Sequence, residues 1–126
     1  MHHHVLIIED EEDVRKAIKL QLAGTSFEIL EAENGEQAIE ILDANALTVD
    51  VIICDLRMPK IAGEEAIAHF RKEYPSTPVI VLTGFPELGR AVDFMKDGVV
   101  DYLTKHVEKS KLVSTVEKAA KKRSIF

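Results

Sequence analysis

The chain has 126 residues and a mass of 14.1 kDa, the size of one ordinary domain. Its formal charge of −6 argues against direct binding to nucleic acid or to an anionic membrane, and no apolar run approaches the roughly 20 residues that a membrane span needs. The single cysteine, Cys54, excludes an internal disulfide and favours a cytoplasmic location.

Five short runs rich in Val and Ile predict five strands, and most of the runs are continuous rather than alternating, as in a parallel sheet that is buried on both faces. In chain order the predicted strands are 4–8, 27–32, 50–54, 78–82 and 99–103.

Between and after these strands, apolar residues recur at helical spacing and predict five helices. In chain order the stripes are Val14, Ile18 and Leu22; Ala38, Ile39 and Leu42; Ala66, Ile67 and Phe70; Leu88, Ala91, Val92 and Met95; and Leu112, Val113, Val116 and Ala120. Gly24, Pro75 and Gly98 lie where helices should stop, and Gly35 opens the second helix.

Strand and helix thus alternate five times, which predicts an α/β domain with an open, doubly wound parallel sheet, since five units are too few for an eight-stranded barrel. Such sheets carry their functional sites outside the carboxyl ends of the strands. Five polar side chains lie within two residues of the ends of the predicted strands: Glu9, Asp10, Asp55, Thr83 and Lys105.

These residue types suit phosphoryl chemistry on a carboxylate. Three carboxylates close together raise one another's pKa unless a cation compensates, and Mg²⁺ binds through carboxylates, phosphate and water. Asp55 can act as a nucleophile that forms an aspartyl phosphate. Glu12 and Asp13, further along the same acidic run, have a different role from Glu9 and Asp10. They suit the first turn of a helix, where free N–H groups favour negative charge.

At these residues the chain resembles the receiver domain of two-component response regulators. The matching segments are VLIIEDEEDVRKAI, EAENGEQAIEIL, VDVIICDLRMPKIAGEEAI, PVIVLTG and DYLTK, in the family's order over essentially the whole chain. The resemblance implies a flavodoxin-like sheet of five parallel strands in the order 2-1-3-4-5 with five helices. We expect the receiver domain at 5–122, a tag remnant or disordered start at 1–4, and a tail or linker start at 123–126.

The resemblance implies a Mg²⁺ (or Mn²⁺) site around the phosphoacceptor Asp55. Asp10 would be a direct ligand, Glu9 would act through water, and the main-chain carbonyl of Arg57 would complete the protein's ligands.

The resemblance also implies which residues contact the phosphoryl group. Thr83 would hydrogen-bond a phosphoryl oxygen and Lys105 would pair with its charge, while Gly84 and Phe85 would line the access to the site. Tyr102 stands at the family's aromatic switch position, where its ring would rotate as Thr83 moves.

The implied partners are a histidine kinase or phosphotransfer protein and an output domain or downstream protein, with no direct nucleic-acid or membrane contact. Receivers also dimerise through the face of the fourth helix, fifth strand and fifth helix, so a homodimer there is a further expectation. The implied class is a signalling phosphoacceptor that assists its own phosphorylation and dephosphorylation, not an enzyme.

One departure from the family pattern and two rival functions leave alternatives open. Lys105-His106 replaces the usual Lys-Pro, whose bond is cis, so cis and trans both remain open here, together with the approach of Lys105. A receiver-like binding module that takes no phosphate is one rival interpretation. A phosphatase of the haloacid dehalogenase type is another, but it needs a second Asp where Arg57 stands.

Overall fold

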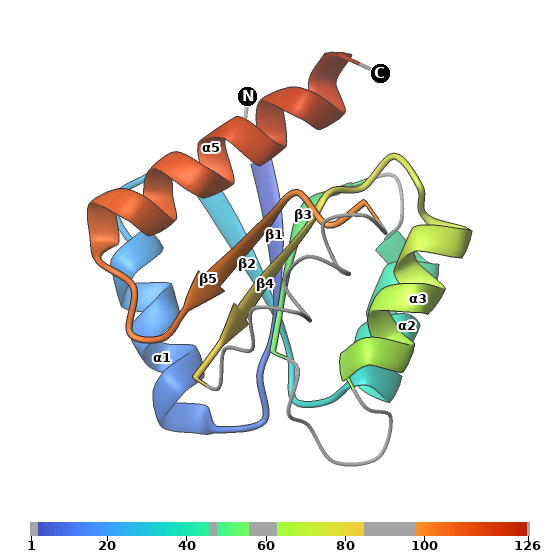
Figure 1. The fold of residues 1–126 in the computed structure, drawn as a ribbon, viewed down its shortest axis with the longest axis horizontal. Coiled ribbons are helices and arrows are strands. Elements are labelled where there is room, and N and C mark those ends of the chain that lie inside the picture. Colours follow the sequence, from blue (N-terminus) through green and yellow to red (C-terminus); the bar gives the residue numbers. More distant parts are fainter. Residues whose placement is uncertain (1–2, 46–47, 56–62, 85–97, 126) are drawn as a thin grey trace.

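In the computed structural model, which describes residues 3–45, 48–55, 63–84 and 98–125, five strands form one parallel sheet in the order β2-β1-β3-β4-β5 (Figure 1). The strands are β1 His3–Ile8, β2 Phe27–Ala32, β3 Val49–Cys54, β4 Val79–Thr83 and β5 Asp101–Thr104. The helices are α1 Glu12–Leu22, α2 Gly35–Asn45, α3 Gly63–Glu73 and α5 Lys109–Ile125. The predicted parallel sheet and its strand order are confirmed.

Successive residues of a strand point to opposite faces of the sheet, and each face has its own core. Leu6 and Ile8 belong to the core beneath α2 and α3, whereas Val5 and Ile7 belong to the core beneath α1 and α5. Figure 1 shows α1 and α5 on one side of the sheet and α2 and α3 on the other. Burial on both faces explains why the strands are apolar at nearly every position.

Most strand boundaries differ from the expectation by one or two residues. Thr83 is the last residue of β4, where it pairs with Thr104, rather than the first residue after that strand. β5 begins at Asp101, although the N–H of Val100 already donates to the carbonyl of Val79 at 2.9 Å.

The predicted fourth helix, with Leu88 and Met95, lies outside the described residues. No described helix is long and apolar enough to cross a membrane.

His3 and His4 fall in the start at 1–4 that was expected to be a tag remnant or disordered; the structure shows them ordered, and their origin in a tag stays a prediction. Both residues belong to β1, where they pair with Phe27 and Glu28 of β2. The N–H of His4 also donates to the Asp50 carboxylate at 2.9 Å. Backbone pairing extends the strand beyond its apolar run, because hydrogen bonds to β2 and β3 do not depend on side-chain polarity.

Phe70 anchors α3 in its core with no exposed surface. We expect Phe70→Ala to lower the free energy of unfolding by about 3–5 kcal/mol, through lost burial and the cavity that remains. Urea unfolding followed by far-UV circular dichroism measures this, since the chain has no tryptophan. Leu20→Ala is the control, because Leu20 is 73% exposed and its truncation should change stability by no more than about 0.5 kcal/mol. Equal losses in the two variants would contradict the packing described for α3.

Candidate functional site

The ends of β1 and β3 place three acidic residues at one edge of the sheet. Glu9 and Asp10 follow β1, and Asp55 follows β3. The N–H of Asp55 donates to the carbonyl of Ile8, and the N–H of Glu9 donates to the carbonyl of Ala32, both at 3.0 Å. The sheet's hydrogen bonds therefore continue one residue beyond the strands and hold the backbones of Glu9 and Asp55 next to each other.

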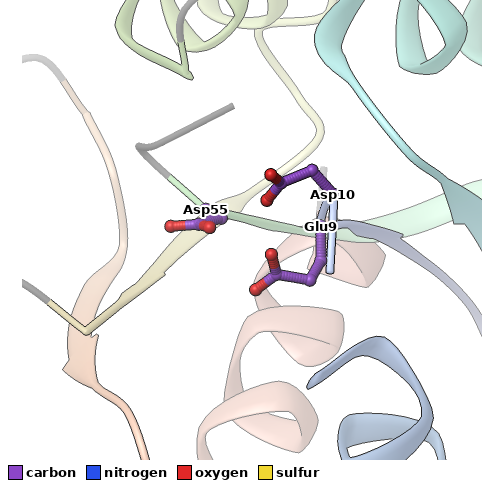
Figure 2. A group of neighbouring side chains, drawn as sticks. All are labelled: Glu9, Asp10 and Asp55. Atoms are coloured by element: carbon purple, nitrogen blue, oxygen red, sulfur yellow. The ribbon is translucent and has the colours of Figure 1, made fainter. Parts of the chain in front are cut away.

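The three side chains gather where these strands end, as Figure 2 shows. One carboxylate oxygen from each of Glu9, Asp10 and Asp55 lies within 4.8 Å of the other two. Glu9 is 1% exposed and Asp55 is 5% exposed, whereas Asp10 is exposed to solvent. Glu9 and Asp55 are thus shielded from water, whereas Asp10 lies at the surface.

Burial raises the pKa of the Glu9 carboxyl to about 7, and a hydrogen bond with Asp10 and the charge of Asp55 push it in the same direction. Hydrogen bonds to Lys105 and to the N–H of Glu11 act the other way. Burial is the largest of these effects, because it disfavours the charged form of the Glu9 carboxyl.

Lys105 supplies one cation to the group. Its Nζ lies 3.2 Å from Oδ2 of Asp55 and forms an ion pair with Oε1 of Glu9. Burial alone would lower the pKa of Lys105, but the hydrogen bond to Glu9 and the two carboxylate charges outweigh it and raise that pKa. The Lys105-His106 peptide bond, whose cis or trans state was open in the sequence, is cis.

The donor set fits a hard divalent cation. Among the residues that the structure describes, three carboxylates gather here and the Lys105 ammonium pairs with two of them, Glu9 and Asp55, which leaves negative charge for a cation to neutralise. Carboxylate oxygens are also the ligands that Mg²⁺ uses in proteins, completed by water or phosphate. The residues present can therefore hold a Mg²⁺ ion.

Thr83 ends β4 and Gly84 follows it, whereas Tyr102 lies within β5, opposite Val81. Thr83 is 1% exposed, and its carbonyl accepts a 2.8 Å hydrogen bond from the N–H of Lys105. A Cβ on Gly84 would lie 3.8 Å from Cδ of Lys105. Tyr102 is half-buried and packs against the core on the α2 and α3 face. Arg57 and Phe85, which the sequence also assigns to the site, lie outside the described residues.

Cys54 precedes Asp55 but offers little chemistry. Its side chain is buried, and burial followed by the charges of Asp55 and Glu9 raises the pKa of the thiol. A thiol held in its protonated form is a poor nucleophile and a poor ligand. The structure therefore supports the interpretation of Cys54 as a small core residue.

Arg15 and Glu31 support the backbone of this site, although the sequence did not indicate them. Arg15 of α1 donates from Nη1 to the carbonyl of Glu9 at 2.8 Å and from Nε to Oε1 of Glu31 at 3.0 Å. Neither residue directly follows a strand. In the sequence, Arg15 and the adjacent Lys16 read as ordinary solvent-exposed residues of a helix. The pairing of β1 with β2 sets Glu31 opposite Ile7, and the contact of α1 with β2 brings Arg15 to it.

Comparison with known proteins agrees with this arrangement. Residues 5–117 match the model of the response regulator receiver domain. The chain is 33% identical over 116 residues to the transcriptional regulatory protein GlrR of Escherichia coli, covering 92% of the chain and 26% of that protein. It is also 33% identical to the chemotaxis protein CheY of Listeria monocytogenes over 118 residues, covering 93% of the chain and 98% of CheY.

Solved structures give the same result. A response regulator receiver domain protein from Clostridium thermocellum superimposes with a TM-score of 0.91 at 31% identity, covering 98% of each chain. The chain spans about a quarter of the length of the first curated relatives, such as GlrR and AtoC, each matched over 26% of its length.

Proposed function

The chain belongs to the family of response regulator receiver domains of two-component signalling, and from this premise we propose that it accepts a phosphoryl group on Asp55 in a Mg²⁺-dependent reaction. The observation that carries the proposal is the meeting of three carboxylates and the Lys105 ammonium at the carboxyl edge of the sheet. A carboxylate that is 5% exposed, faces a lysine and adjoins a cation site is suited to nucleophilic attack on phosphorus.

The proposed step is an exchange of one bond at phosphorus. A carboxylate oxygen of Asp55 attacks the phosphorus atom of a phosphohistidine, and the P–N bond breaks with its electron pair left on the imidazole nitrogen. That nitrogen takes up a proton, and Asp55 becomes an acyl phosphate. Later attack by water on phosphorus restores the carboxylate and releases inorganic phosphate, which completes the proposed self-assisted dephosphorylation.

Each neighbour has a part in stabilising charge on the phosphoryl oxygens. Glu9, Asp10 and Asp55 would hold the Mg²⁺ ion, with the carbonyl of Arg57 as the further expected ligand, and the ion would neutralise phosphoryl charge. Lys105 would move its ammonium from the carboxylates to the incoming phosphoryl group. Gly84 and Phe85 stay the predicted lining of the access route.

Phosphorylation is proposed to act through Thr83 and Tyr102. Thr83 would turn its hydroxyl toward a phosphoryl oxygen, and the Tyr102 ring would follow into the space that this movement opens. Such a switch shifts a pre-existing equilibrium, and moving the active form from about 1% to about 99% needs roughly 5.5 kcal/mol of differential stabilisation.

The proposed donor is a histidine kinase or phosphotransfer protein, and the proposed receiver of the signal is an output domain or a separate protein. Two relatives that match over their receiver portion, GlrR and NtrC, are named as transcriptional regulators. Dimerisation through β5, α5 and the predicted fourth helix stays a prediction. We also keep a cytoplasmic location in the proposal, since one buried free thiol suits a reducing compartment.

Removal of the metal tests the proposal. The chain is incubated with acetyl phosphate and MgCl₂, and intact mass spectrometry should detect the gain of one phosphoryl group. With excess EDTA in place of MgCl₂, we expect at least about a hundredfold slower gain, because the charges of donor and site are then left without compensation. A chain that gains no mass with Mg²⁺ present would instead be a binding module of the same fold.

A further inference from the structure

We propose that Arg15 is a positioning residue for the cation site, holding the loop that carries Glu9 and Asp10 through the main-chain carbonyl of Glu9. This inference rests on the proposed function, because it concerns the same Mg²⁺ site. Arg15 touches neither the cation nor the phosphoryl group in this scheme, and it acts only through Glu9.

The backbone of Glu9 has two polar groups with different partners. Its N–H remains in the sheet, donating to the carbonyl of Ala32 at 3.0 Å. Its carbonyl lies beyond the end of β1 and accepts the 2.8 Å hydrogen bond from Nη1 of Arg15. The sheet fixes the peptide before Glu9, and Arg15 fixes the peptide after it, which leads into Asp10.

Arg15 is itself held firmly enough to act as an anchor. Its side chain is 11% exposed, and Nε donates to Oε1 of Glu31 on β2 at 3.0 Å. Lys19, one turn further along α1, binds Oε2 of the same carboxylate at 3.0 Å. The hydrogen bond from Lys19 and the two neighbouring cations lower the pKa of Glu31, so this carboxylate stays ionised at neutral pH.

The loop from β1 to α1 contains only Glu9, Asp10 and Glu11, so a rotation of one peptide moves both proposed ligands. The N–H of Glu11 donates to Oε2 of Glu9 at 3.2 Å, and the N–H of Arg15 donates to the carbonyl of Glu11 at 3.0 Å. Loss of the guanidinium leaves the Glu9 carbonyl without this partner and frees the peptide to turn toward water. Mg²⁺ demands near-octahedral geometry, so misplaced carboxylates bind it more weakly.

The test compares Arg15→Met with Lys19→Met by isothermal titration with MgCl₂. Groups that support metal ligands from outside typically contribute 10–100-fold in affinity, and we expect about tenfold weaker Mg²⁺ binding in Arg15→Met. Lys19→Met is the matched control, since it removes a cation from the same Glu31 carboxylate and leaves the Glu9 carbonyl bond intact. Its affinity should equal that of the unsubstituted chain.

A second readout separates positioning from general destabilisation. Acetyl phosphate reactions over a range of MgCl₂ concentrations should show a higher half-saturating Mg²⁺ concentration for Arg15→Met, with a maximal rate unchanged at saturating Mg²⁺. Arg15→Lys should recover part of the affinity, because an ammonium can reach the carbonyl without also spanning to Glu31. Urea unfolding establishes that each variant is folded under the assay conditions.

Three results would overturn the inference. Unchanged Mg²⁺ affinity in folded Arg15→Met would refute the positioning role alone. An equal loss in Lys19→Met would assign the effect to the charge network around Glu31. A lack of Mg²⁺ binding by the unsubstituted chain would refute the proposed function, and the positioning role with it.

Discussion

Asp55→Asn should gain no phosphoryl group from acetyl phosphate in the presence of MgCl₂, while the unsubstituted chain gains one. The amide has nearly the shape of the carboxylate but no charge and little nucleophilicity at oxygen, so the acyl phosphate has no route to form. Stability without Mg²⁺ should hold or rise, because one of three mutually repelling carboxylates is removed. Intact mass spectrometry and urea unfolding measure the two effects.

Asp50→Asn is the matched control for this experiment. Asp50 belongs to the same strand, β3, but near its amino end, where its carboxylate accepts from the N–H of His4. Its amide variant should take up the phosphoryl group as the unsubstituted chain does. Phosphorylation of Asp55→Asn at an undiminished rate would mean that another side chain is the acceptor, and the assignment to Asp55 would then be wrong.

The sheet could be predicted from sequence because its strands are buried on both faces. Continuous runs such as Val51 to Cys54 leave few other structures open, and the alternation with helical stripes selects a parallel sheet. The strand ends could not be predicted to the residue, because hydrogen bonding decides them. His3 and His4, for example, join β1 although they are polar.

The meeting of the three carboxylates of the candidate site could be predicted from where the strands end. Contacts that depend on how the strands pair could not be predicted. Glu9, Asp10 and Asp55 converge because parallel strands end at the same edge. The contact of Arg15 with Glu31 follows from the pairing of β1 with β2, which no local pattern encodes. The geometry of Lys105 was open in the sequence because a histidine follows it in place of proline, and the structure brings its ammonium to Asp55 and Glu9.

Asp10→Ala should weaken Mg²⁺ binding by at least about a hundredfold, since loss of a direct ligand should cost no less than the upper end of the range for outer supporting groups. Phosphorylation at low millimolar Mg²⁺ should slow accordingly. Asp10 is the exposed member of the three carboxylates, so its truncation leaves no cavity and little packing is lost. Titration calorimetry with MgCl₂ and the acetyl phosphate reaction measure the two effects.

Asp13→Ala provides the comparison that separates a ligand from an ordinary acidic residue three positions away. Asp13 lies in the first turn of α1, where a carboxylate near free N–H groups typically contributes about 0.3–1 kcal/mol to stability. Its removal should lower stability by that amount and leave Mg²⁺ binding intact. Asp10→Ala should do the reverse, because without Mg²⁺ it relieves repulsion around Glu9 and Asp55 while it removes a ligand. If both variants lost stability and kept their Mg²⁺ affinity, the acidic run would be no more than a helix start.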